Sequence, residues 1–579
     1  MPSTNSRRLT SGSAAQAFPG TFTHCGERTD NMRVPRLPEK GTARMAIRDR
    51  FCLSAALSLS ALLAVAHPGS VRAENTDQSV WPTSEWLTST PEEQGMDSAA
   101  LAKLVAYGES HDFDSLLVVR HGRIVTEAYY APYTGNLQHE IFSSTKAVIG
   151  TLVGIMYKDG VLDRLDHPML DFFSDRRVAN VDDRKQAITV QDLLDMTSGL
   201  DWTQGFQGEE EITLHEMYRS SNWTQFILDR AMARVPGEIF NYSNGDPNLV
   251  SAIITRLTGK LAEDYAREKL FEPLGITNWH WEREPEGLSI GDGFLTLLPR
   301  DMAKIGYLYL RHGQWEGKQL LPPGWADVLS HTLLNTHASD DPNLSYSNFI
   351  WVFPDKHVFM ASGLNGQDIF VFPDLDVVAV TTAREYVRFR TLIGGVAATV
   401  KSEAALPPNP DGADLLANTI KDAAVEKPSA VSPTPELASM ISGKTYKFPD
   451  NDLGLKSLTL FLTGPNPHLE YASSSKYPLE YASSLKYPPN ASVTYRAPIG
   501  LNGLFRQGAP ALNGLNPGHI PALKGTWLNR QTFEIDSEGL GQGRKTRYRF
   551  SFDGAKLHFH FAPEHEPEVS VDGEQSDPR

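Results

Sequence analysis

A serine and a lysine three residues apart, Ser143 and Lys146 in the stretch IFSSTKAVIG (141–150), are the strongest candidates for chemistry in this sequence. The apolar residues after them predict a helix, and side chains at positions i and i+3 lie on one face of a helix. A serine hydroxyl is a weak nucleophile that needs a neighbouring base. A closed site can favour the neutral form of an amine, and a neutral amine can act as that base. The pair therefore predicts a nucleophile, Ser143, served by Lys146.

The same spacing also has a structural interpretation, in which Ser143 only caps the helix and Lys146 is unrelated to it. The chain repeats the Ser-x-x-Lys spacing twice within the tandem duplication LEYASSSKYP–LEYASSLKYP (469–488), and neither copy opens an apolar helix. Spacing alone therefore favours the cap, and other motifs must support the catalytic interpretation.

A tyrosine and an asparagine supply the next candidate groups. The stretch VPGEIFNYSNGD places Tyr242-Ser243-Asn244 after a Pro-Gly turn and before a predicted helix. A phenol and an amine lose their protons in the same high pH range, so in a closed site they can share one proton. Lys146 and Tyr242 would form such a pair, and the sequence leaves open which of them is the general base.

Together with LLDMTSGL (193–200) and FMASGLNGQ (359–367), these motifs resemble the serine hydrolases related to class C β-lactamases and DD-peptidases, over about residues 84–402. The GLNGQ segment is similar to the 6-aminohexanoate-dimer hydrolase branch. The resemblance implies that Ser143 is acylated, that Lys146 and Tyr242 handle protons, and that Asn244 holds Lys146 and the substrate carbonyl side. It also implies an oxyanion hole made by the backbone N–H groups of Ser143 and Leu364.

The third motif departs from the family pattern. β-Lactamases and DD-peptidases usually carry Lys-Thr-Gly there, whereas this chain has Ala361-Ser362-Gly363. Without that lysine, recognition of a substrate carboxylate loses a charge-assisted contact worth about 1.5–3 kcal/mol. The departure argues against efficient β-lactam turnover and favours an esterase or a linear-amide hydrolase.

We therefore expect a secreted serine hydrolase that cleaves an ester or amide bond in a small-molecule or oligomeric substrate. The alternatives are β-lactamase, DD-peptidase or D-aminopeptidase-like activity, or a catalytically silent binding protein with the same fold. We expect no cofactor and no metal, because the chain has no HExxH or nucleotide motif. His558 and His560 alternate with phenylalanines, which is typical of a strand with one solvent-exposed face and not of a metal site.

The elements that must position these groups predict an α+β fold. Strand patterns lie at both ends of residues 84–405, in SLLVVRHGRIVTEAYY (115–130) and FMASGLNGQDIFVFPDLDVVAVTTA (359–383), with helical stretches between them. This order predicts a β-lactamase-like antiparallel sheet closed by distant segments, with flanking helices and a helical lobe. A Pro-rich linker is expected at 406–435, a small all-β domain at 436–565 and a disordered acidic tail at 566–579.

The start of the chain predicts export. From Met45, basic residues, an apolar run and the small-residue sequence VRA before residue 74 form a signal peptide at 45–73, and residues 1–44 are interpreted as a disordered upstream extension. The mature protein would be periplasmic or secreted, without a stable membrane span.

The formal net charge of the chain is −16. Removing the first 73 residues, with ten basic and four acidic side chains, changes it to about −22. Such a charge disfavours nucleic-acid binding. The oligomeric state is left open.

Two other groups were candidates for secondary roles. A second Tyr-Ser-Asn, at 346–348, lacks a preceding Pro-Gly turn, and we interpret it as a solvated loop. Trp202 and Phe206 follow LLDMTSGL in the sequence, and both interpretations are kept for them: lining of the substrate pocket or packing in the core.

Overall fold

The computed structural model describes residues 81–576, apart from 205–210, 475–492, 510–519 and 565–567. All the described residues belong to one compact unit, Thr76–Arg579. The signal peptide expected at 45–73 and the extension at 1–44 lie outside the described residues. Within the described part of the chain, no helix has both the length and the apolar character needed to cross a membrane.

A nine-stranded sheet forms the framework of the N-terminal half. Its neighbours are antiparallel except for β1, which is parallel to β3. The strands β2 and β14 come from opposite ends of this region, and Leu117 lies opposite Val380. The predicted α+β sheet closed by distant segments is thereby confirmed. In spatial order, the strands are β1 (Leu87–Thr88), β3 (Arg123–Tyr129), β2 (Phe113–Arg120), β14 (Val377–Ala383), β13 (Gln367–Phe372), β12 (Val358–Gly363), β11 (Ile350–Phe353), β10 (Ser345–Ser347) and β9 (Leu334–Asn335).

Helices cover both faces of this sheet. On one face, α10 (Pro299–Leu310) approaches so closely that a Cβ on Gly306 would lie 2.7 Å from Ile369. On the other face, Phe389 of α11 (Phe389–Thr399) packs on Phe370, with ring centroids 6.3 Å apart. Because Ile369 and Phe370 are successive residues of one strand, they point to opposite faces of the sheet.

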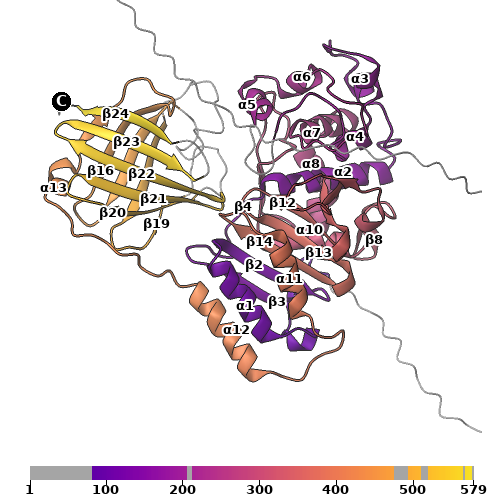
Figure 1. The fold of residues 1–579 in the computed structure, drawn as a ribbon, viewed down its shortest axis with the longest axis horizontal. Helices are drawn as coiled ribbons and strands as arrows, with labels where there is room; N and C mark the ends of the chain where they lie inside the picture. Colours follow the sequence, from indigo (N-terminus) through magenta and orange to yellow (C-terminus); the bar gives the residue numbers. More distant parts are fainter. Residues whose placement is uncertain (1–80, 205–210, 475–492, 510–519, 565–567, 577–579) are drawn as a thin grey trace, which may run out of the picture. The chain divides into compact units, whose positions relative to one another are not determined.

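The helix α1 (Ser98–Glu109) packs with α11 and with α12 (Pro410–Ala423), as Figure 1 also shows. The helix α12 lies inside the Pro-rich stretch that we expected to be a linker. Its residues Leu416 and Ala423 are buried in the main hydrophobic core. This part of the linker region therefore packs on the sheet half of the molecule.

A helical lobe fills the stretch between the early and late strands, and its main helix is α2 (Thr145–Lys158). This helix is buried from Thr145 to Met156, as expected for a helix that is apolar on all sides. A small sheet contains β4, the strand that precedes α2 in the chain. In spatial order, its strands are β4 (His139–Glu140), β6 (Leu295–Leu297) and β5 (His280–Trp281). The other main helices of the lobe are α4 (Val190–Leu194), α5 (Ile212–Arg219), α6 (Trp223–Leu228), α7 (Gly245–Thr258) and α8 (Ala262–Ala266).

The C-terminal part is a closed β-barrel with its own core, which confirms the predicted small all-β domain. Its strands alternate buried and exposed residues, as in β23, and an extra pairing of β18 with β20 closes the ring. Figure 1 shows the later strands β20 to β24 side by side. The strands are β15 (Thr445–Lys447), β16 (Leu455–Phe461), β17 (His468–Ser473), β18 (Val493–Gly500), β19 (Arg506–Gln507), β20 (Ile520–Trp527), β21 (Thr532–Leu540), β22 (Arg544–Asp553), β23 (Lys556–Pro563) and β24 (Val569–Gln575).

The last strand corrects the expected disordered tail at 566–579. Residues Val569–Gln575 form β24, which pairs with β23 and β15. Although this segment is acidic, burial alternates along it as in a strand: Val569, Val571 and Gly573 are more buried than the polar residues between them. The prediction of disorder is therefore wrong for this strand, because a neighbouring sheet supplies its hydrogen bonds.

Candidate active site

Ser143 lies in a single 3-10 turn, η2 (Phe142–Ser144), directly before α2. The turn is fixed from two sides: the N–H of Ile141 donates to the carbonyl oxygen of Leu295 (2.8 Å), and the Oγ of Ser144 donates to the carbonyl oxygen of Gln367 (2.7 Å). Ser143 itself is only half-buried, whereas the residues after it are buried. The hydroxyl of Ser143 is thus the accessible group at the start of a buried helix.

The residue before the serine has an unusual backbone. Phe142 has a φ of 44°, in the left-handed region that bulky side chains rarely adopt. Such conformations persist only where the surroundings hold them, and they are concentrated at functional sites. The conformation of Phe142 turns the chain sharply between β4 and α2, and so sets the direction in which Ser143 emerges.

Lys146 meets Ser143 from the next turn of the chain. Its Nζ donates to the Oγ of Ser143 (2.8 Å) and to the carbonyl oxygen of Asp292 (2.9 Å). The same Nζ lies 5.0 Å from the centroid of the Tyr242 ring, and the side chain of Lys146 is buried. The hydroxyl, the amine and the phenol ring, which the sequence places up to a hundred residues apart, thus share one site.

The loop that carries Tyr242 is held by the segment LLDMTSGL. The N–H of Asn241 donates to the carbonyl oxygen of Met196 (2.8 Å). The Oγ of Ser198 donates to Oδ1 of Asp246 (2.9 Å), in the first turn of α7. The Tyr242 ring also stacks on Trp351, with centroids 5.7 Å apart. The segment 193–200 therefore has a structural role: it fixes the loop before α7.

Asn244 lies directly before the first residue of α7. Its N–H donates to Oε1 of Gln204 (2.9 Å), its carbonyl oxygen accepts from Nδ2 of Asn248 (2.8 Å), and its side chain bonds the hydroxyl of Tyr218. Among the described residues, the Nζ of Lys146 donates to Ser143 and to the carbonyl oxygen of Asp292. The role of Asn244 toward Lys146 and the substrate stays a prediction.

Asp292 and Tyr218 are site residues that the sequence analysis missed. The carboxylate of Asp292 accepts from the hydroxyl of Tyr218 (2.7 Å) and from Nδ2 of Asn248 (2.8 Å). Burial raises the pKa of Asp292, and the positive charge of Lys146 opposes this rise. The signal in the sequence is Gly291-Asp292-Gly293. A Cβ on Gly291 would lie 2.1 Å from the carbonyl oxygen of Pro247, so only glycine lets this turn approach α7 so closely.

The third motif ends β12 beside the nucleophile turn. A Cβ on Gly363 would lie 2.2 Å from the carbonyl oxygen of Ile141, so glycine is required where this strand passes the segment before Ser143. Leu364 follows at the strand end with its side chain 57% exposed. Ala361 is buried and brings no charge to the site. Leu364 thus directly follows the glycine that passes the segment before Ser143, and its role as an oxyanion-hole donor stays a prediction.

Two secondary predictions have clear outcomes. The residues Tyr346-Ser347-Asn348 are not a solvated loop, because Tyr346 lies in β10 with 1% of its surface exposed and packs on Phe240. Trp202 is buried in the core, so the core interpretation is confirmed for this residue. Phe206 lies outside the described residues.

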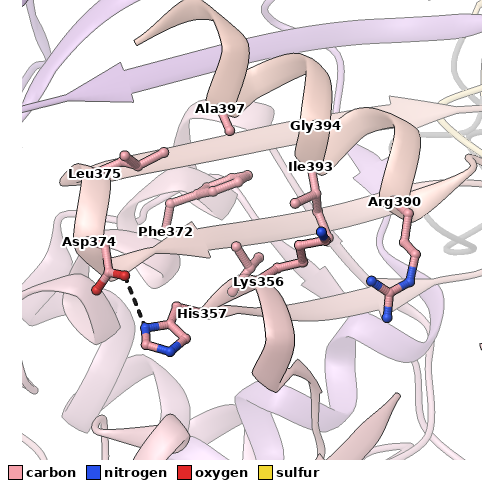
Figure 2. A pocket seen from close by; sticks show the side chains of 10 residues that line it. Lys356, His357, Phe372, Asp374, Leu375, Arg390, Ile393, Gly394 and Ala397 are labelled. Carbon is pink, nitrogen blue, oxygen red and sulfur yellow. Dashed lines mark hydrogen bonds and ion pairs between the residues drawn. The ribbon is translucent and has the colours of Figure 1, made fainter. Parts of the chain in front are cut away.

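A separate surface pocket of about 260 Å³ lies between α11 and the turns of β12 to β14 (Figure 2). Its charged side chains already have partners: Nδ1 of His357 lies 3.0 Å from Asp374, and Arg390 pairs with Asp341 and Asp355. We assign it no role in the chemistry, because none of the three groups around Ser143 lines it. The lining residues are Lys356, His357, Val358, Phe372, Asp374, Leu375, Arg390, Ile393, Gly394 and Ala397.

Part of this chain is similar to known proteins. The beta-lactamase family model matches residues 106–382. The 6-aminohexanoate-dimer hydrolase of Paenarthrobacter ureafaciens is 22% identical over 290 residues, which are 46% of this chain and 71% of that protein.

Among solved structures, a Bacillus anthracis protein provisionally named a 6-aminohexanoate-dimer hydrolase aligns with 60% of this chain and 89% of its own, at 19% identity and a TM-score of 0.45. The octameric penicillin-binding protein homologue of Pyrococcus abyssi aligns with 82% of this chain and 99% of its own, at 16% identity and a TM-score of 0.42.

Proposed function

We propose that this protein is a serine hydrolase that cleaves an ester or a linear amide through an acyl-enzyme at Ser143. The match of the beta-lactamase family model to residues 106–382 supports this proposal. The observation that carries the proposal is the 2.8 Å hydrogen bond between the Nζ of Lys146 and the Oγ of Ser143. The Tyr242 ring beside the same Nζ supports it, because a second acid–base group is then within reach of the reacting atoms.

In acylation, the Oγ of Ser143 attacks the carbonyl carbon while its proton passes to the Lys146–Tyr242 pair. The carbonyl oxygen becomes an oxyanion, which the backbone N–H groups of Ser143 and Leu364 stabilise. The tetrahedral intermediate collapses, the bond to the leaving alcohol or amine breaks, and the pair returns the proton to that group. Water then attacks the acyl-enzyme by the same route, which releases the acid and restores the Ser143 hydroxyl.

The third motif guides the choice of substrate. Ala361 stands where the related β-lactamases and DD-peptidases carry a lysine, so the strand offers no cation to a substrate carboxylate. An ester or a linear amide without a carboxylate at that position loses no binding energy when the lysine is absent. The similarity to a 6-aminohexanoate-dimer hydrolase agrees with linear amides as one class of substrate. A small-molecule or oligomeric ester or amide is therefore the proposed substrate.

We also propose that the protein acts outside the cytoplasm, in the periplasm or as a secreted enzyme. The basis is the leader sequence at 45–73, which combines a charged start, an apolar run and a small-residue cleavage sequence. N-terminal sequencing of the exported protein tests this proposal. A mature chain that begins at residue 74 supports it, and recovery of the whole leader in the cytoplasm contradicts it.

The decisive experiment labels the nucleophile with a fluorophosphonate probe. The Ser143→Ala variant should lose both labelling and hydrolysis of p-nitrophenyl esters, because the probe reacts only with an activated serine hydroxyl. The Ser144→Ala variant is the matched control, since this neighbouring hydroxyl is buried and bonded to the carbonyl of Gln367. It should keep its labelling.

Labelling that survives in Ser143→Ala would refute the assignment. A panel of nitrocefin, a D-amino-acid amide, p-nitrophenyl esters and a short nylon oligomer then separates the substrate classes. Turnover of nitrocefin at a rate equal to that of the esters would contradict the preference for substrates without a carboxylate.

A further inference from the structure

One hairpin of the C-terminal barrel contacts the segments on both sides of the candidate oxyanion hole. The hairpin consists of β21, β22 and the turn between them, Gly541-Gln542-Gly543. We propose that this turn is a positioning element of the active site, which holds the Ser143 turn and the Leu364 turn at the separation that the oxyanion requires. The inference rests on the proposed serine hydrolase function and adds the barrel to the catalytic unit.

The first contact is with the strand that leads to the nucleophile. The N–H of Glu140 in β4 donates to the carbonyl oxygen of Gly541 (2.7 Å). A Cβ on Gly541 would lie 2.0 Å from the carbonyl oxygen of Gln138, so the two backbones touch directly. Since only Ile141 and Phe142 separate Glu140 from the nucleophile, the barrel turn fixes the approach of the chain to Ser143.

The second contact is with the loop after the third motif. The Nδ2 of Asn365 donates to the carbonyl oxygen of Gly543 (2.8 Å). Asn365 directly follows Leu364, the residue expected to supply the second oxyanion donor. A Cβ on Gly543 would lie 3.0 Å from Nε2 of Gln367 and 3.1 Å from Cε2 of Phe142. Gly543 therefore lies against both halves of the hole, including the strained residue before the serine.

The stem of the hairpin is tied to the N-terminal half by ion pairs on both strands. Glu538 in β21 pairs with Arg384 (2.6 Å), and both side chains are more than nine-tenths buried. Lys545 in β22 pairs with Asp112 (2.6 Å). Glu538 and Lys545 lie opposite each other in the hairpin register. With an anchor on each strand, the turn cannot tilt away from the site without breaking one of the two pairs.

This arrangement predicts a specific kinetic effect. Oxyanion donors act on charge that develops in the transition state, so their displacement slows turnover more than it weakens substrate binding. A misplacement of about 1 Å at a reacting centre costs on the order of 10²-fold in rate. A disturbance of the barrel turn should therefore lower kcat and leave KM nearly unchanged.

The test uses the full-length chain and a matched pair of glycines. Gly543 and Gly554 both have a φ of 57° and both lie in barrel hairpin turns. A Cβ on Gly554 has nothing within 4 Å, whereas a Cβ on Gly543 meets Phe142 and Gln367. The two alanine variants therefore carry the same backbone strain, and only Gly543→Ala pushes on the active site.

We expect Gly543→Ala to lower kcat for a p-nitrophenyl ester several-fold, up to about 10-fold, with little change in KM, and to slow fluorophosphonate labelling in parallel. Gly554→Ala should behave as wild type in both assays. Equal kcat values for the two variants would overturn the inference. If Gly543→Ala does not fold, Asn365→Gly replaces it, because glycine tolerates the φ of 58° at that position and only the bond to Gly543 is lost.

Asn365→Gly with wild-type kcat would equally overturn the inference. The wild-type enzyme separates this outcome from a failure of the proposed function. A wild-type protein that is labelled at Ser143, with glycine variants that behave alike, refutes only the role of the barrel turn. A wild-type protein that is neither labelled nor active refutes the serine hydrolase assignment and with it the inference.

Discussion

Lys146 has a different environment from the one that its motif implies. The carbonyl oxygen of Asp292 accepts one of its hydrogen bonds, and the Asp292 side chain is fixed behind that carbonyl by Tyr218 and Asn248. The Nζ of Lys146 therefore lies close to a buried carboxyl that already has two hydrogen-bond donors. We infer that Asp292 is a positioning residue, which acts on Ser143 through Lys146.

The variant Asp292→Asn tests this role. An asparagine has one side-chain oxygen in place of two, so it cannot accept from both Tyr218 and Asn248 in the present geometry. Hydrogen bonds to charged groups are worth about 1.5–3 kcal/mol, so we expect kcat to fall by about 10- to 100-fold. The pH profile of kcat/KM should also change, because the substitution removes the titratable carboxyl of Asp292, whose pKa burial raises.

The control for this prediction is Asp195→Asn. Asp195 is a half-buried carboxyl whose Oδ1 accepts from the backbone N–H of Asn348, and it has no contact with Lys146 among the described interactions. This variant should keep both kcat and the pH profile of the wild type. If Asp292→Asn lowers stability as much as it lowers activity and leaves the profile in place, Asp292 is structural only.

The sequence could predict three of the groups that meet at the site but not their supporting residues. Ser143, Lys146 and Tyr242 belong to short motifs with fixed chemistry. Asp292 and Tyr218 are single residues whose partners lie far along the chain, and no spacing links them. The glycines on each side of Asp292 were the available signal, because a Gly-x-Gly turn often allows a close backbone approach.

At the scale of single elements, the loop before α7 carries a buried acid that makes its stability depend on pH. Asp246 lies in the first turn of α7 and accepts from the hydroxyl of Ser198. Its other oxygen, Oδ2, is buried without a hydrogen-bond partner among the described residues. Burial raises the pKa of Asp246 to about 8. The folded protein should therefore hold a proton on this carboxyl at neutral pH.

The pH dependence follows from the difference between the two states. An aspartate in the unfolded chain has a pKa of about 3.9, so between about pH 4 and pH 8 the folded state binds one more proton than the unfolded state. The free energy of unfolding must then fall as the pH rises through this window. In Asp246→Asn this pH-dependent part of the free energy of unfolding is absent, because the amide does not titrate. The amide oxygen can still accept the hydrogen bond from Ser198.

Urea unfolding of both proteins at about pH 5 and about pH 9 measures this effect. Relative to Asp246→Asn, the wild type should lose a few kcal/mol of stability between the two pH values. A constant difference between the two proteins at both pH values would show that Asp246 is ionised in the folded state.

The elements themselves were largely predictable, because apolar periodicity reports the local conformation. The wrong predictions concern two segments that we expected to be exposed to solvent. Tyr346 was expected in a solvated loop, yet β10 pairs with β9 and β11, and Trp351 packs on the tyrosine ring. The segment Val569–Gln575 was expected to be disordered, yet it pairs with strands on both sides. Phe240, which also packs on Tyr346, and β15, which pairs with β24, are distant in the sequence, and a local pattern of polar residues cannot reveal such contacts.

At the scale of the whole molecule, a buried ion cluster joins the barrel to the sheet. Arg384 donates to Asp114 (2.8 Å) and to Glu538 (2.6 Å), and its guanidinium lies 4.9 Å from the centroid of the Tyr133 ring. Asp114 and His139, which lie 3.5 Å apart, are fully buried beside it. The sequence could predict two domains, but it could not predict this cluster, because its members come from four separate segments.

Removal of the central cation should destabilise the protein strongly. Arg384→Met leaves two buried carboxylates without their partner, and the loss of one member of a buried ion pair costs about 3–5 kcal/mol. The control is Arg549→Met, which breaks an exposed pair with Glu534 on the barrel and should cost at most about 1 kcal/mol. Chemical denaturation of both variants measures the difference. Equal destabilisation would show that the buried cluster adds nothing beyond a surface pair.

The borders of the large sheet also affect how copies of this protein can associate. Its outermost strands, β1 and β9, are two residues long, and the barrel strands close on themselves through β18 and β20. A short edge offers few free main-chain groups to a strand from another molecule, and a closed barrel offers still fewer. Concentrated solutions of the folded protein should therefore resist fibrous polymerisation, and any assembly of copies should be held together by side-chain contacts.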